Sequence, residues 1–175
     1  MSLNIVWIPR FQNTKADYIS NLVDYEDWQT TEEFFHFVDQ NWGPHSIDRF
    51  ASVSNTVLSR FNSLFWYPES ETVDAFTQNW RFEKKWLVPQ IKFVCRTINH
   101  IVMCRGNGTL IVPKWPSGSF WTLLFGKNME YRGYVVDVLE FTLYQNVFKH
   151  GSYSKSLFGS DRLNSRVLAV RLCAD

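Results

Sequence analysis

The stretch KKWLVPQIKFVCRTINHIVMCRGNGTLIVPKW, residues 84–115, decides the fold class. It starts as an apolar run that ends at a proline, continues with a helical period, and turns at RGNG into a second, β-branched apolar run. In the helical part we expect Val94, Ile98, Ile101 and Val102 to face inward. Strand, helix and strand in this succession form a right-handed crossover between parallel strands. The stretch therefore predicts an α/β protein.

The flanking segments extend this pattern in both directions. Thr30 and Glu33 have the spacing of a capping box, and an apolar helical face follows them up to Gly43. We predict further strands in SIDRFAS, YVVDVLEF and RVLAVRL. The segment SNTVLSRFNSLFW predicts a short helix and a strand, and PSGSFWTLLFG predicts the start of a helix.

Composition narrows the classes of protein that this chain can belong to. Its 175 residues, 45% of them hydrophobic, suffice for one domain with a sizeable core. A formal charge of +1 argues against a strongly basic surface for nucleic acid, although local basic patches are still compatible with it. Three cysteines without a CxxC pair favour a reduced compartment. No apolar run approaches about 18 residues, so we expect no membrane partner. Together with the cysteines, this predicts an intracellular protein, in cytoplasm or nucleus.

The N-terminal segment carries a first resemblance. VWIPRFQNTKADYISN, residues 6–21, is similar to the end of the RNase H domain in retroelement polyproteins of the DIRS type. The resemblance implies that Asp17 is the last of the acids that hold two divalent metal ions there. The other acids would precede Met1, so we expect metal binding and RNase H activity only in an intact parent protein. The predicted division is 1–25 as an RNase H remnant and 26–175 as the main domain.

A longer resemblance covers most of residues 27–124. DWQTTEEFFHFVDQNWGPHSIDRFAS, followed by RFNSLFW, VDAFTQNW and GTLIVPKWPSGSFWTLL, resembles the module after RNase H in these elements. That module is itself similar to phage-type adenine methyltransferases. The resemblance implies a Rossmann-like, mainly parallel sheet and S-adenosylmethionine as the cofactor, lying beside Asp48, Ala51, Ser52 and Asn55.

Two acids at predicted strand ends have alternative interpretations. Asp48 and Asp74 are placed to bind the ribose hydroxyls of a nucleoside cofactor, as such acids do in doubly wound folds. Capping or turn roles are the alternative, because aspartate commonly bonds to the backbone that follows it.

The catalytic loop of the family maps onto Val88, Pro89, Gln90 and Ile91. In the family this loop is an Asn-Pro-Pro-Phe or Asp-Pro-Pro-Tyr type tetrad, whose first side chain binds the adenine amine and whose ring stacks on the flipped base. Only the proline matches here. Val88 cannot accept the hydrogen bond of the amine, and Ile91 has no ring, so the target nitrogen would not be oriented. Methyl transfer to adenine is therefore not expected.

A basic stretch with interleaved aromatic residues precedes this loop. Arg81, Lys84, Lys85 and Trp86 are predicted to contact single-stranded nucleic acid, since rings can stack on bases while cations neutralise phosphates. The alternative is that these side chains are the polar ends of a half-buried loop.

Taken together, the motifs predict a fragment of a retroelement polymerase polyprotein. Its methyltransferase-like module would be inactive and would bind DNA, RNA or a nucleoside, or serve as structure. Two alternatives stay open: an active DNA adenine methyltransferase that uses S-adenosylmethionine, and an interaction module that packs on the polymerase and RNase H portions of the same polyprotein.

Overall fold

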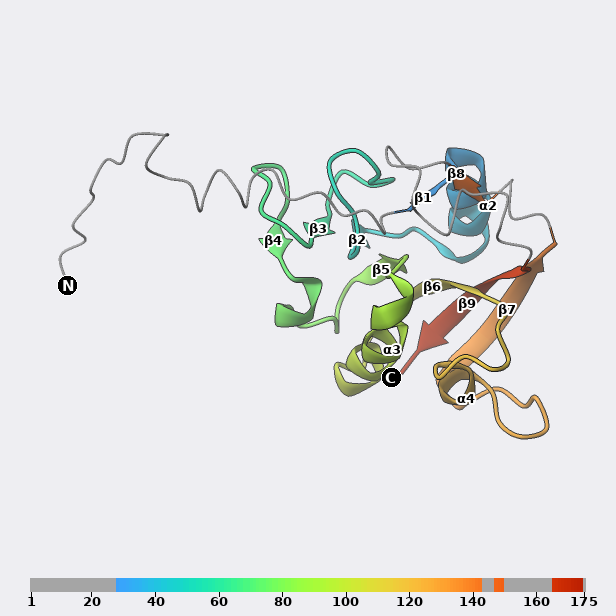
Figure 1. The fold of residues 1–175 in the computed structure, drawn as a ribbon. Coiled ribbons are helices and arrows are strands. Elements are labelled where there is room, and N and C mark those ends of the chain that lie inside the picture. The colour runs from blue at the N-terminus through green and yellow to red at the C-terminus, as the bar shows by residue number, and fades with distance from the viewer. Residues whose placement is uncertain (1–27, 143–146, 150–164, 175) are drawn as a thin grey trace, which may run out of the picture.

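The computed structural model describes residues 28–142, 147–149 and 165–174 (Figure 1). Asp17, the predicted RNase H remnant and the predicted domain boundary lie outside these residues. Within them the chain is mixed α/β, which confirms the fold class. A five-stranded sheet has the order β2-β5-β6-β9-β7, with β2 (Ile47–Asp48), β5 (Lys84–Leu87), β6 (Asn107–Pro113), β7 (Val135–Phe141) and β9 (Val167–Cys173).

Short elements surround this sheet. Two further strand pairs are β1 with β8, antiparallel, and β3 with β4, parallel: β1 (Gln29–Thr30), β8 (Phe148–Lys149), β3 (Asn62–Ser63) and β4 (Thr72–Val73). The helices are α2 (Glu32–Trp42), α3 (Val94–Met103) and α4 (Trp121–Leu124), with 3-10 turns η1 (Ala75–Thr77) and η2 (Ile91–Phe93).

The predicted crossover is present in the middle of the sheet. Strand β5 pairs in parallel with β6 from Lys84 opposite Asn107 to Leu87 opposite Leu110, and α3 connects the two strands. Three of the four predicted inward residues of α3, Val94, Ile98 and Ile101, are buried, and Val102 is partly buried against the same cluster.

The sheet is mixed, whereas a mainly parallel one was expected. Strands β2, β5 and β6 pair in parallel, but β9 runs antiparallel between β6 and β7. Four successive residues of β9, Val167 to Val170, are buried. A strand that is buried on both faces reads as a continuous apolar run whatever its direction, so the sequence did not show this reversal.

Backbone contacts extend the sheet beyond β2. Asp48 and Phe61 form a parallel bridge, the Asp48 N–H donates to the carbonyl of Arg60 at 2.9 Å, and the Ala51 N–H donates to that of Asn62 at 3.1 Å. The β3-β4 pair therefore continues the sheet, and the strands follow the order β4-β3-β2-β5-β6-β9-β7. The helix predicted near residue 54 is absent from this described segment, which forms turns instead.

Helix α2 has the predicted apolar face, but another residue than the predicted one caps it. Phe34, Phe35, Val38 and Trp42 are buried, and Gly43 ends the helix. The hydroxyl of Thr31 accepts the Phe34 N–H at 3.2 Å, so Thr31 is the cap. Thr30 cannot cap the helix because it already belongs to β1, opposite Phe148.

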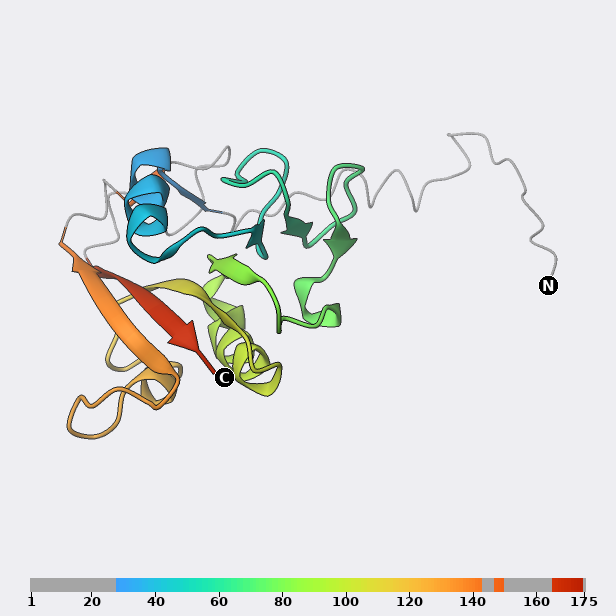
Figure 2. The ribbon, with the colours of Figure 1, turned by 180° about the vertical axis from the view of Figure 1, so that it is seen from behind.

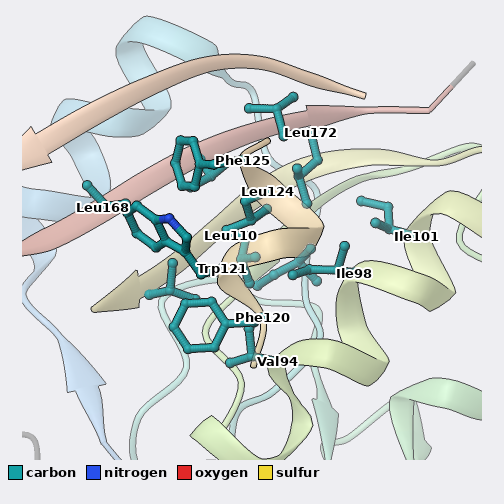
Figure 3. Close-up of a cluster of buried hydrophobic side chains, with 14 of the residues drawn as sticks. Val94, Ile98, Ile101, Leu110, Phe120, Trp121, Leu124, Phe125, Leu168 and Leu172 are labelled. Carbon is teal, nitrogen blue, oxygen red and sulfur yellow. The ribbon is translucent and has the colours of Figure 1, made fainter. Parts of the chain in front are cut away.

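Two apolar clusters cover the two faces of the sheet. Helix α2 lies over one face and helices α3 and α4 lie over the other (Figures 1 and 2). On the α2 face, Trp86 and Ile111 pack among the rings of the helix. On the α3 face, Leu110, Leu168 and Leu172 meet side chains of α3 and α4 (Figure 3). Successive residues of a strand point to opposite faces, so each strand supplies both clusters.

Candidate functional site

The loops that follow β2, β4 and β5 meet at one end of the sheet, which we call the carboxyl edge. The Arg49 N–H donates to the carbonyl of Trp86 at 3.1 Å, which holds the loop after β2 against β5. The rings of Phe50 and Phe76 lie 5.5 Å apart, and those of Phe76 and Phe93 lie 6.1 Å apart. The structure thus brings together the loops that carry the predicted cofactor residues and the degenerate tetrad.

The tetrad position is part of the core. Val88 and Pro89 are buried, and Val88 packs within the apolar cluster of the α2 face. Ile91 is partly buried and touches both clusters, and the carbonyl of Gln90 accepts the Phe93 N–H at 2.8 Å to start η2. These four residues therefore serve packing and a turn. The loop offers neither an acceptor side chain at Val88 nor a stacking ring at Ile91.

The predicted cofactor residues after β2 have contacts with their own loop. Asp48 is buried, and its Oδ1 accepts the Phe50 N–H at 3.2 Å. Ala51 is also buried. The Oδ1 of Asn55 accepts both the N–H and the hydroxyl of Ser52, at 2.5 and 3.0 Å. These bonds fit a polar turn better than a nucleoside cradle.

The same loop lacks a usual feature of nucleotide sites. Residues 49–56 contain no glycine, whereas doubly wound folds use glycines there so that the backbone can approach the ligand. Binding of S-adenosylmethionine by this loop stays a prediction.

Asp74 begins η1 at the carboxyl edge. Its Oδ1 accepts the Phe76 N–H at 3.0 Å, and its Oδ2 lies 3.9 Å from Nη2 of Arg96 on α3. The backbone at Asp74 has φ 57°, a left-handed conformation that aspartate tolerates better than most residues. These contacts give Asp74 the capping role that was the alternative to ribose binding.

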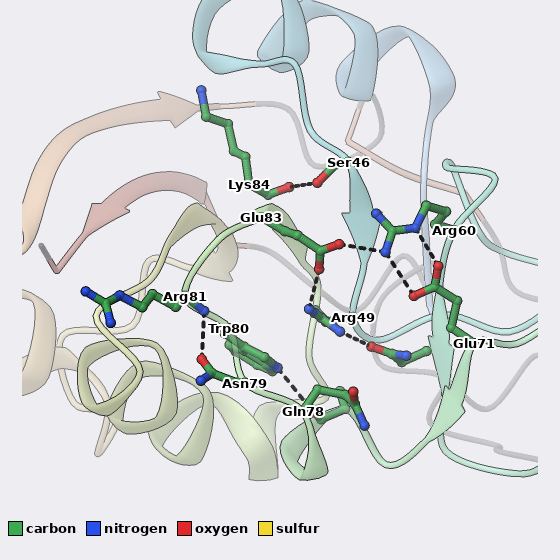
Figure 4. Close-up of polar contacts among 12 residues, drawn as sticks. Ser46, Arg49, Arg60, Glu71, Gln78, Asn79, Trp80, Arg81, Glu83 and Lys84 are labelled. Atoms are coloured by element: carbon green, nitrogen blue, oxygen red, sulfur yellow. Dashed lines mark hydrogen bonds and ion pairs between the residues drawn. The ribbon is translucent and has the colours of Figure 1, made fainter.

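A buried arginine, which the sequence analysis missed, links the two halves of the sheet. Arg49 donates to Oδ1 of Asn62 at 2.6 Å and to Oε2 of Glu83 at 2.8 Å, and Arg60 bonds to Glu83 and Glu71 (Figure 4). Burial lowers the pKa of Arg49, while the charges of Glu83 and Glu71 oppose that shift. The network joins β2, β3 and the segment before β5, so it holds strands together.

The predicted nucleic-acid stretch divides into an exposed part and a buried part. Lys85 and Trp86 are fully buried and therefore cannot contact a nucleic acid at the surface. The ammonium of Lys84 donates to the carbonyls of Trp42 and Gly43 at 2.8 and 3.0 Å, where it caps α2. Arg81 stays exposed, with its guanidinium 5.5 Å from the ring centroid of Phe82.

Phe82 is the most exposed large hydrophobic residue described, at 86%. A Cβ built on Gly106 would lie 2.3 Å from the carbonyl oxygen of Trp80, so the turn after α3 runs close to the segment before Phe82. This turn also carries the exposed Arg105 and follows the exposed Met103. We call the exposed residues next to this approach, Arg81, Phe82 and Arg105, the Arg81–Phe82 surface. The sequence analysis missed Arg105 because β5 and α3 separate it from Phe82 along the chain.

Two cysteines and a histidine on and just after α3, Cys95, His100 and Cys104, do not converge on one point. The Sγ of Cys104 lies 3.6 Å from Nε2 of His100, which also lies 2.9 Å from the carbonyl of Gln78. The Sγ of Cys95 lies 3.3 Å from Oγ of Ser119 instead. Among the described residues, no three His, Cys, Asp or Glu side chains gather where they could hold a metal ion.

Comparison of the sequence with protein-family models and with curated proteins finds no match. In the part of the chain that the structure describes, no helix combines the length and the apolarity that crossing a membrane requires.

Proposed function

We propose that this chain is a non-catalytic, methyltransferase-like domain derived from a retroelement polymerase polyprotein, and that it binds single-stranded nucleic acid. The observation that carries the loss of catalysis is the burial of Val88 among apolar side chains. The resemblance puts the acceptor for the adenine amine at this position. A valine packed in the core supplies no such acceptor and leaves no room for a base beside it.

The strand order supports the methyltransferase-like fold. The chain places β2 at the centre, adds β3 and β4 outward, returns to β5 beside β2, and continues with β6 on the other side. We infer from this reversal of direction that the sheet is doubly wound, with its switch point between β2 and β5.

The Arg81–Phe82 surface supports the nucleic-acid ligand. An exposed ring can stack on any base, and a guanidinium beside it can both stack and neutralise phosphate. Arg105 adds a second exposed cation to the same surface. This mode needs no strongly basic protein, so it agrees with the net charge of +1.

The test is the affinity for a fluorescent oligothymidine, measured by anisotropy at low salt. Loss of a stacking ring costs about 1–3 kcal/mol per base, so Phe82→Ala should weaken binding about fivefold or more. Arg81→Gln should weaken binding and reduce its dependence on salt. The matched control is Phe37→Ala, which removes a half-exposed ring on α2. Equal affinities of Phe82→Ala and the wild type would refute the nucleic-acid role of this surface.

A second candidate function is packing against the polymerase and RNase H portions of the polyprotein. It is favoured by a group of exposed apolar side chains on or after β3 and β4, namely Leu64, Trp66 and Val73. Trp66→Asp should then abolish co-purification with those portions, while Val136→Asp, on β7, should not. Failure of the wild-type chain to co-purify with either portion would remove this candidate.

A further inference from the structure

A cavity of about 220 Å³ lies at the opposite end of the parallel strands, which we call the amino edge. Its floor includes two alternate rows of the sheet. One row is Lys84, Asn107 and Cys173, and the other contains Thr109 opposite Arg171. Trp42, at the end of α2, lines it from above the α2 face. The remaining lining residues are Gly108 and Leu172.

The residues that line the cavity include two cations, Lys84 and Arg171, and no acid. Lys84 uses two of its three ammonium protons on the last carbonyls of α2, which leaves one donor and offsets the negative end of the helix dipole. The guanidinium of Arg171 makes no hydrogen bond or ion pair with any other described side chain, although Asp137 lies opposite on β7. Two positive groups are thus available to an anion.

The cavity also has hydrogen-bond acceptors, to which an anion without a proton could not donate. The Nδ1 of His45 lies 2.6 Å from Oδ1 of Asp39, and its Nε2 lies 2.7 Å from Oγ1 of Thr109. Burial lowers the pKa of His45, and the ring is therefore neutral near pH 7, with its proton on Nδ1 toward Asp39. The Nε2 then accepts the hydroxyl proton of Thr109, so the threonine oxygen can only accept from a ligand.

Asn107 provides a second acceptor. Its Oδ1 is buried and receives no hydrogen bond from any residue that the structure describes. A buried amide oxygen without a donor is costly, and a ligand hydroxyl would satisfy it.

We propose that the amino-edge cavity is a binding site for a phosphate group that carries a proton, as hydrogenphosphate or a phosphate monoester. Its anionic oxygens accept from Arg171 and Lys84, and its P–O–H donates to Thr109 or Asn107. Sulfate at neutral pH has the same shape but no proton to donate. The inference rests on the cavity alone and holds whether or not the Arg81–Phe82 surface binds nucleic acid.

The test is calorimetric titration of the folded protein with inorganic phosphate at pH 7, with sulfate and adenosine monophosphate as further probes. Arg171→Gln should weaken phosphate binding about tenfold or more, because a charge-assisted bond is lost. Arg132→Gln, which removes an exposed arginine outside the cavity, is the matched control and should leave binding unchanged. Sulfate should bind at least several-fold more weakly than phosphate.

Thr109→Val is the second variant, because it removes the acceptor and keeps the shape of the side chain. It should weaken phosphate but not sulfate, with circular dichroism to verify that the variant is folded. Competition by adenosine monophosphate would support a nucleotide as the source of the phosphate group. No phosphate binding by the folded wild type, or equal binding by Arg171→Gln, would overturn the site. Equal affinity for sulfate and phosphate would overturn the role of the proton.

Discussion

The two edges of the sheet contrast in what fills them. At the carboxyl edge, where doubly wound folds bind their ligands, Val88 is buried and the rings of Phe50 and Phe76 pack together. At the amino edge, Lys84 and Arg171 border a cavity. Topology gives the place where a site can form, whereas the side chains decide whether it exists. Both proposed ligand sites, the Arg81–Phe82 surface and the amino-edge cavity, therefore lie away from the carboxyl edge.

We expect the largest effect on stability from a polar residue placed at the carboxyl edge. Val88→Asn should lower the free energy of unfolding by about 3 kcal/mol, because it loses apolar burial and desolvates an amide. Val136→Asn, on the exposed side of β7, should change it by no more than about 0.5 kcal/mol. Urea unfolding measures both. A Val88→Asn protein as stable as the wild type would mean that this edge is an open site after all.

A smaller effect concerns the charged groups near the amino edge. Burial lowers the pKa of His45 in the folded state, so the unfolded chain, with an ordinary value near 6.5, takes up the proton first. The free energy of unfolding should therefore fall as the pH drops below about 6.5, by up to about 1.4 kcal/mol per pH unit. Lys84 contributes to this shift, whereas Asp39 opposes it.

The measurement is urea unfolding at several pH values between 5 and 7.5. His45→Gln should remove most of this dependence, whereas His36→Gln, on the exposed side of α2, should keep it. A slope that survives in His45→Gln would show that this imidazole is not the group whose protonation destabilises the fold.

The cap that Lys84 forms on α2 should contribute less to the free energy of unfolding than the two effects above. Lys84→Met removes two hydrogen bonds to the carbonyls of Trp42 and Gly43, and we expect a loss of about 1 kcal/mol. Lys127→Met, in an exposed loop, is the matched control and should be neutral. The thermal unfolding midpoints of the two variants give the comparison. Equal midpoints of the two variants would mean that the hydrogen bonds of Lys84 to α2 do not stabilise the fold.

The smallest effect on stability is expected at the Arg81–Phe82 surface. Phe82→Ala should change the free energy of unfolding by no more than about 0.5 kcal/mol, because 86% of the residue is already exposed. A loss of stability well above that value would show that the ring packs in solution, and the surface would then need another explanation.

The apolar spacing in the sequence predicted the central elements and their buried faces well, but it predicted contacts between distant residues less well. The unit from Lys84 to Trp115 and the buried face of α2 follow from apolar spacing, which a chain carries in one dimension. Burial of Lys85 and Trp86 was missed because a strand at the centre of a sheet is covered on both faces. The cavity was missed because Arg171 reaches Thr109 only through the register of β9, which no local pattern reveals.

The most direct test of the central claim is transfer of a labelled methyl group from S-adenosylmethionine to adenine-containing DNA by the purified chain. Because Val88 and Ile91 provide neither the acceptor nor the ring that the reaction needs, we predict no incorporation above a protein-free control, from the same preparation that binds oligothymidine. Incorporation that disappears in Asp48→Ala would contradict the account, since it would show a working methyltransferase site at the carboxyl edge.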